Sequence, residues 1–107
     1  MALFVHDGKA IPDAPQYKDP DSTVDYSVDW ASWLGADTIS ASTWLINGTL
    51  SASVDGITIT AISNTTTTAT AWLSGGTELT TYIFTNRITT SGGRTEDRSF
   101  TLEARQK

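Results

Sequence analysis

The chain has 107 residues, a net charge of −5 at neutral pH and no cysteine. This length suffices for one domain with one hydrophobic core, and the lack of thiols excludes disulfides, zinc–thiolate centres and cysteine nucleophiles. The acidic charge argues against a nucleic-acid partner, because phosphate contacts need clustered Lys and Arg. With 19 Thr, 11 Ser and four Trp, the composition favours an all-β protein with an aromatic core.

Residues 1–22 contain all three prolines and Gly8, which predicts an extended N-terminal arm without regular elements and a folded domain over 23–107. Near its start the arm carries Leu3, Phe4 and Val5. These apolar side chains either fold back on the domain or dock on a neighbour, and both alternatives stay open. No apolar run reaches the roughly 20 residues of a membrane span. The first six residues lack a signal-peptide pattern, so we expect synthesis in the cytoplasm and no membrane partner.

The first predicted strand follows the arm. Along this strand, apolar residues alternate with Asp and Ser. The apolar residues, which are expected to point inward, are Val24, Tyr26, Val28 and Trp30. After a turn at Gly35, residues 38–44 return as a second strand. Asn47-Gly48 and Asp55-Gly56 mark further turns around short strands at 50–54 and 57–60, which predict a hairpin.

Three more strands complete the pattern. Residues 68–73 form one that ends at Ser74-Gly75-Gly76, and residues 82–88 and 100–102 flank a turn at Ser91-Gly92-Gly93. About seven short strands result, with a turn signal at roughly every 8–12 residues. This spacing predicts an immunoglobulin-like antiparallel β-sandwich.

Individual residues sharpen the prediction. Tyr82 begins the penultimate strand after a loop, where immunoglobulin-like domains carry a tyrosine corner; a plain core tyrosine is the alternative. Asn86 falls on the inward face of the same strand and is expected to be buried with its hydrogen bonds satisfied. Trp44 and Trp72 lie mid-strand and are expected in the core, whereas Trp33 lies at a corner and is a candidate for an exposed anchor.

Charge is unevenly distributed: residues 1–55 sum to −6 and the remainder to +1. Two solvated faces explain this. The alternative is head-to-tail association of copies, in which one copy's carboxylates meet the next copy's arginines. The residues predicted to meet across such a contact are Asp19, Asp21, Asp25 and Asp29 on one side and Arg87, Arg94 and Arg98 on the other.

Catalysis and cofactors are not expected. His6 is the only histidine and lies in the arm, so no Ser-His-Asp triad can form on the domain. Alternating Asp residues on an outward strand face serve solubility more often than acid–base chemistry. A calcium site at Asp19, Asp21 and Asp25 remains a minor alternative, because the segment lacks the EF-hand pattern.

Three stretches of the chain carry a family resemblance. They are KDPDSTVDYSVDWASWL at residues 18–34, DTIS at 37–40 followed by Trp44, and TTATAWLSGGT at 67–77 leading to Tyr82, RITT at 87–90 and Gly93-Arg94. Together they resemble the bacteriophage fibre-tail adaptor proteins, a family of small virion proteins. The resemblance extends from Lys18 to the C-terminus.

This resemblance implies a non-enzymatic structural protein of a tailed phage virion, made in the bacterial cytoplasm and acting as an adaptor at the head–tail or fibre–tail junction. Its expected partners are other virion proteins of the tail, connector or fibre and further copies of itself. The resemblance does not include the arm, and Leu3, Phe4 and Val5 are expected to be its anchors because they are apolar. A capsid decoration protein is one alternative. A carbohydrate-binding module at a tail fibre is the other, and it would depend on exposure of Trp33.

Overall fold

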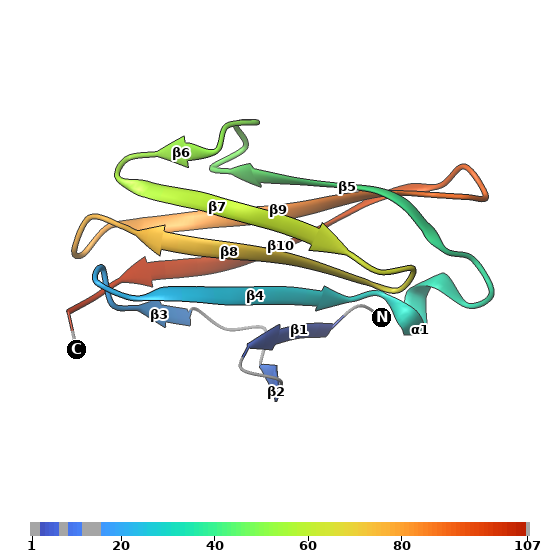
Figure 1. Ribbon diagram of the computed structural model, residues 1–107, viewed down its shortest axis with the longest axis horizontal. Coiled ribbons are helices and arrows are strands. Elements are labelled where there is room, and N and C mark those ends of the chain that lie inside the picture. Colours follow the sequence, from blue (N-terminus) through green and yellow to red (C-terminus); the bar gives the residue numbers. More distant parts are fainter. Residues whose placement is uncertain (1–2, 7–8, 12–15, 107) are drawn as a thin grey trace.

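The computed structural model describes residues 3–6, 9–11 and 16–106, and it is an all-β sandwich (Figure 1). Its elements are β1 (Leu3–His6), β2 (Lys9–Ile11), β3 (Gln16–Lys18), β4 (Thr23–Asp29), α1 (Ala31–Leu34), β5 (Ile39–Ile46), β6 (Ser53–Val54), β7 (Ile57–Asn64), β8 (Thr68–Gly75), β9 (Thr81–Thr90) and β10 (Thr95–Ala104).

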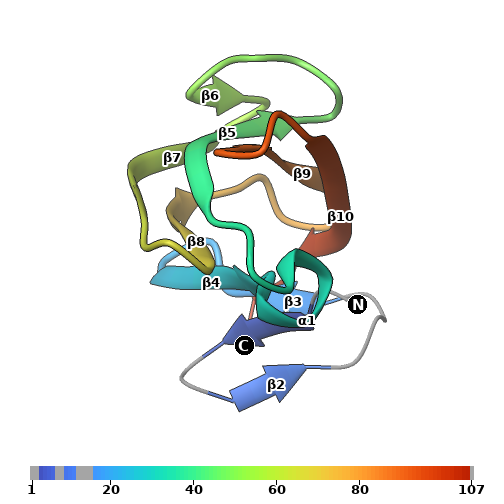
Figure 2. The same ribbon diagram turned by 90° about the vertical axis from the view of Figure 1, so that its right-hand side faces the viewer.

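The strands form two sheets. One has the order β2-β1-β4-β8-β7-β6 and the other the order β3-β10-β9-β5, with β3 parallel to β10 and the remaining pairs antiparallel. Figure 2 shows the two layers almost end-on. The segments β1-β4-β8-β7 and β5-β9-β10 correspond to the ABED and CFG sheets of immunoglobulin domains. The predicted immunoglobulin-like sandwich is therefore confirmed, with additional short strands β2, β3 and β6.

The prediction that residues 1–22 contain no regular element is wrong. β1 pairs antiparallel with β4 and with β2, and β3 pairs with β10. Gly8 and the three prolines all fall between strands. Glycine and proline therefore separate short strands here and do not prevent them. An edge strand needs only three or four residues without proline.

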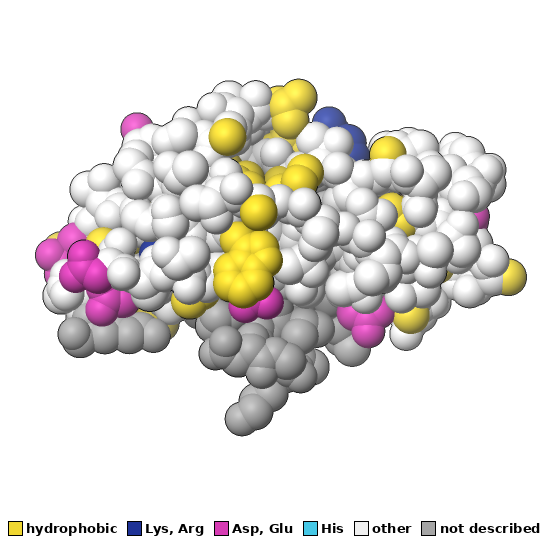
Figure 3. All heavy atoms as spheres, in the orientation of Figure 1, with side chains coloured by type: hydrophobic (Ala, Val, Ile, Leu, Met, Phe, Trp, Pro, Cys, Tyr) yellow, Lys and Arg dark blue, Asp and Glu magenta, His cyan; other side chains and the backbone are white. Residues whose placement is uncertain are grey.

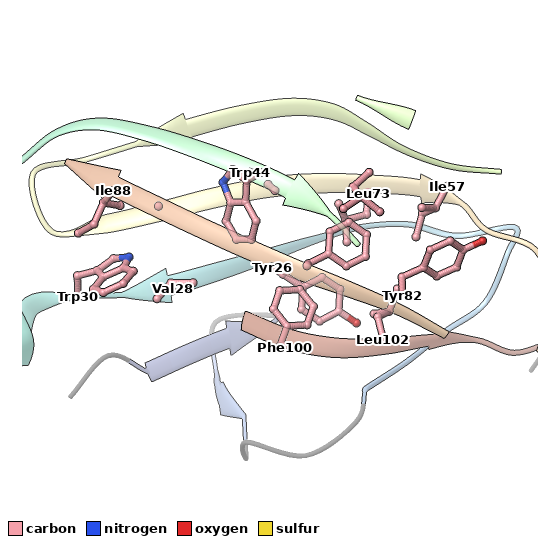
Figure 4. Close-up of a cluster of buried hydrophobic side chains, with 14 of the residues drawn as sticks. Tyr26, Val28, Trp30, Trp44, Ile57, Leu73, Tyr82, Ile88, Phe100 and Leu102 are labelled. Carbon is pink, nitrogen blue, oxygen red and sulfur yellow. The ribbon is translucent and has the colours of Figure 1, made fainter. Parts of the chain in front are cut away.

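The core lies between the sheets and follows the predicted alternation (Figure 4). Tyr26, Val28 and Trp30 face inward and are at most 2% exposed. Phe100 stacks on both Tyr26 and Phe84, with ring centroids 5.1 and 5.6 Å apart. Aromatic side chains from both sheets thus fill the interior.

Tyr82 forms the predicted tyrosine corner. Its buried hydroxyl donates a 2.6 Å hydrogen bond to the Asp55 carbonyl oxygen and accepts one from the Thr77 backbone N–H at 2.9 Å. The phenol therefore fixes the loop before β9 and the turn before β7 to one another.

Candidate functional site

The predicted acidic residues are distributed along one side of the molecule rather than gathered at a point. Asp19 lies in the β3–β4 turn, where its Oδ1 accepts the backbone N–H of Asp21 at 2.9 Å. Asp25 and Asp29 lie four residues apart on β4 and so point to the same face of the sheet. Asp29 Oδ1 accepts a hydrogen bond from the backbone N–H of Ala31 at 3.0 Å. Among the described residues, no three His, Cys, Asp or Glu side chains lie close enough to hold a metal ion.

The three predicted arginines lie on the β9–β10 hairpin. Arg87 on β9 binds both carboxylate oxygens of its cross-strand neighbour Asp97, at 2.8 and 3.0 Å. This pairing raises the pKa of Arg87, chiefly through the hydrogen bond to Asp97. Arg98 lies on β10 opposite Asn86 and is partly buried.

Arg94 is the centre of a clamp at one end of the sandwich. Its Nε lies 3.2 Å from Oδ2 of Asp37, its Nη2 donates to the Leu34 carbonyl oxygen at 3.0 Å, and its guanidinium lies 4.2 Å from the centre of the Trp33 ring. Trp33 also packs edge-on against Trp30. Arg94 therefore joins the β9–β10 turn to α1, and Trp33 is only partly exposed.

Asp37 receives several hydrogen bonds in this clamp. The Thr90 side chain lowers its pKa most, and the backbone N–H groups of Thr38 and Gly92 and the Arg94 side chain lower it further, to about 2. The carboxylate is consequently ionised at neutral pH.

Lys18 is a buried cation that no sequence pattern indicated. Its side chain is 2% exposed, and Nζ donates to the carbonyl oxygens of Asp19, Ser22 and Gly75 at 2.6–2.9 Å. Burial lowers its pKa, while the nearby Asp19 and Asp21 act in the opposite direction. Because all three donors of an ammonium group are used by backbone, the role of Lys18 is structural.

The apolar arm residues are placed only in part. The backbone of Leu3, Phe4 and Val5 folds back as β1 on the edge of β4, with Phe4 opposite Val28. Their side chains lie outside the described part of the structure, so the prediction that they anchor a neighbour remains a prediction.

The prediction that Trp72 lies in the core is wrong. Trp72 is 42% exposed, not buried, whereas Trp44 is 3% exposed as expected. On β8 the inward positions are taken by Ala69, Ala71 and Leu73, all fully buried. Alternation along a strand then forces Trp72 outward, so the small alanines were the signal that could have placed it.

The structure adds an open apolar groove between β5 and β7, which we call the β5–β7 groove. It has a volume of about 390 Å³. Its apolar lining comes from Trp44, Leu50, Ala52, Ile59, Ala61 and Ile62. Leu50 and Ile62 are 72% and 52% exposed, and yellow side chains run across this face in Figure 3. No sequence pattern predicted the groove, because it depends on how the two sheets diverge.

The strand order and the tyrosine corner define the protein as an immunoglobulin-like β-sandwich domain. A helix long and apolar enough to cross a membrane is absent from the described part of the chain. These features alone specify no partner, since this sandwich supports many unrelated functions.

The family model described as "Podophage GP4 fiber-tail adaptor protein gp77" matches residues 18–103, and the chain belongs to this family of phage structural proteins. The matched region begins at the last residue of β3 and ends one residue before the end of β10. It therefore contains nearly the whole sandwich, and the predicted family is confirmed. A search of curated proteins found no match.

Proposed function

We propose that this protein is a non-enzymatic adaptor at the head–tail or fibre–tail junction of a tailed phage, where it connects other virion proteins through protein–protein contacts. The observation that carries the proposal is the family match over residues 18–103, which spans the folded domain rather than one motif. The proposed location is the virion, after synthesis in the bacterial cytoplasm.

The architecture supports a connecting role. Lys18 joins the β3–β4 turn to the end of β8, Arg94 joins α1 to the β9–β10 turn, and Tyr82 joins two loops. These bonds fix the loops at both ends of the sandwich. A domain with fixed loops loses little conformational entropy on binding, which favours contacts between rigid parts.

We propose further that several copies assemble in the particle, without nucleic-acid or membrane partners. The separation of charge along the sequence supports head-to-tail contacts between Asp19, Asp21, Asp25 or Asp29 of one copy and arginines of the next. Arg87 is the most informative arginine to change, because it is exposed and its reversal leaves the Arg94 clamp intact. If Arg87→Glu leaves assembly unchanged at physiological salt, the charge contact does not involve this arginine.

The adaptor role is tested by the copy number of the protein in purified virions of the parent phage. Quantitative mass spectrometry scales its peptides to those of the major capsid protein. About a dozen copies or fewer per particle is expected for a symmetric junction. Hundreds of copies would indicate a capsid decoration protein instead, and absence from the particle would refute the assignment.

A further inference from the structure

β7 has a backbone edge that is only partly paired. Its first residues pair with β6, through Ile57 opposite Val54 and Thr58 opposite Ser53, and the Ile59 N–H donates to the Ala52 carbonyl oxygen at 2.7 Å. From residue 61 to residue 64, β7 pairs with β8 along one edge, after a register shift between Ile59 and Ala61. Along the other edge, no strand of the described ranges pairs with it.

The side chains beside this edge are apolar and open to solvent. Ile62 pairs with Ala71, which is fully buried, so both side chains face the interior side of the sheet. Ile62 is nevertheless 52% exposed, because β5 leaves this part of β7 uncovered and the β5–β7 groove opens here. Trp72 lies opposite Ala61, which lines the groove, and so borders the same region.

The unpaired edge specifies the kind of occupant. An extended peptide backbone can form ladder hydrogen bonds with residues 60–64, whereas a helix or a small apolar molecule would leave those amide and carbonyl groups to water. Alternate side chains of an added strand point to the same side. Every second side chain of such a strand would therefore enter the apolar groove.

Charge further defines the occupant. The strands β4, β7 and β8 contain no Lys or Arg, and their only charged residues are Asp25 and Asp29. Asp25 lies directly opposite Trp72 in the β4–β8 ladder. With a chain charge of −5, this face complements a segment that is apolar and basic, and it disfavours an acidic one.

We propose that the free edge of β7 binds an extended, basic segment of another virion protein as an added strand. Alternate apolar side chains of that segment occupy the β5–β7 groove, and a Lys or Arg on its other side lies over the outer face of β7 toward Trp72. This inference rests on the proposed adaptor function and identifies the surface through which the adaptor holds its partner.

The test compares Ile62→Lys with Ile83→Lys in phage particles. Ile62 and Ile83 are 52% and 49% exposed strand residues, but Ile83 lies on β9, in the other sheet and away from the groove. Thermal unfolding of the purified variants checks that both fold. The measured quantity is the copy number per virion relative to the major capsid protein. For Ile62→Lys it is expected to fall by about tenfold or more, which corresponds to a loss of about 1.4 kcal/mol of binding free energy. For Ile83→Lys it is expected to stay near the wild-type value.

Trp72→Ala provides a second variant at the border of the groove and is expected to lower the copy number as well. Ser63→Lys, which puts a cation on the outer face of β7 at its free edge, tests the charge. If Ile62→Lys and Trp72→Ala enter virions like wild type, the docking surface is refuted while the adaptor function stands. If Ser63→Lys has no effect although Ile62→Lys lowers the copy number, the basic character of the segment is refuted. If wild-type protein is absent from virions, both proposals fail.

Discussion

Nε1 of Trp30 donates a 2.9 Å hydrogen bond to Oδ1 of Asn86, and so joins the residue that follows β4 in one sheet to the middle of β9 in the other. The Asn86 amide nitrogen in turn donates to Oγ of Ser42 at 2.9 Å and to the Thr43 carbonyl oxygen at 3.1 Å. Both Trp30 and Asn86 are essentially inaccessible to solvent. A fully satisfied polar network of this kind fixes how the two sheets are aligned.

Replacing Asn86 with Leu is expected to destabilise the protein by about 1–3 kcal/mol, because the Trp30 indole N–H is left buried without an acceptor. Thermal unfolding should show a midpoint lower by about 4–8 °C for each kcal/mol. The matched control is the pair Trp30→Phe and Trp30→Phe/Asn86→Leu. If the two residues are coupled as described, Asn86→Leu costs less in the Trp30→Phe background than in wild type; equal costs would contradict the coupling.

Tyr82→Phe removes only the hydroxyl that donates to Asp55 and accepts from Thr77. The expected loss is about 1–3 kcal/mol of unfolding free energy, since a backbone carbonyl and an N–H lose their partner in a partly buried place. Denaturant unfolding measures it. Tyr17→Phe is the control, because the Tyr17 side chain is 46% exposed and its change should have little effect. Equal stability of Tyr82→Phe and wild type would show that water replaces the hydroxyl.

Much of the fold could be predicted from alternation and turn residues. The inward series Tyr26, Val28 and Trp30 was readable because polar residues separate its members, and Tyr82 was readable because a Gly-containing loop precedes it. Asn86 was predicted as a buried polar group with satisfied hydrogen bonds, because it is one of the alternate residues of β9 that point inward. Each of these features depends on spacing within one strand.

The features that escaped prediction depend on relations between strands. Trp72 was assigned to the core by its size, although Ala71 and Leu73 take the inward positions on either side. The β5–β7 groove is lined by residues from strands of two different sheets, so it depends on how β5 and β7 are placed relative to one another. The Arg94–Asp37 contact joins residues 57 positions apart. None of these can be derived from periodicity in a single segment.

The clamp at Asp37 predicts a specific response to acid. The folded-state pKa of Asp37 is about 2, below its ordinary value of 3.8, so the ionised form stabilises the fold. That contribution is complete above about pH 4 and is lost as the pH falls through about 2. Denaturant unfolding of wild type and Asp37→Asn is expected to show the wild type more stable at pH 5–7 and the difference shrinking between pH 4 and pH 2. A difference independent of pH would exclude ionised Asp37 as its source.

The opposite placement of two tryptophans gives the last prediction. Trp44 is 3% exposed and packs edge-on against Phe100 at 6.4 Å, whereas Trp72 is 42% exposed on the outer face of β8. Trp44→Ala is expected to cost about 3–5 kcal/mol, because it leaves a cavity between the sheets. Trp72→Ala is expected to cost about 1 kcal/mol or less, because its ring already contacts solvent.

Fluorescence quenching gives an independent check of the two positions. Two variants each retain one tryptophan, Trp72 or Trp44, with the others changed to Phe. Acrylamide should quench the fluorescence of Trp72 strongly and that of Trp44 much less. If the two indoles are quenched equally, the assignment of β8 faces is wrong, and with it the position of Trp72 beside the groove.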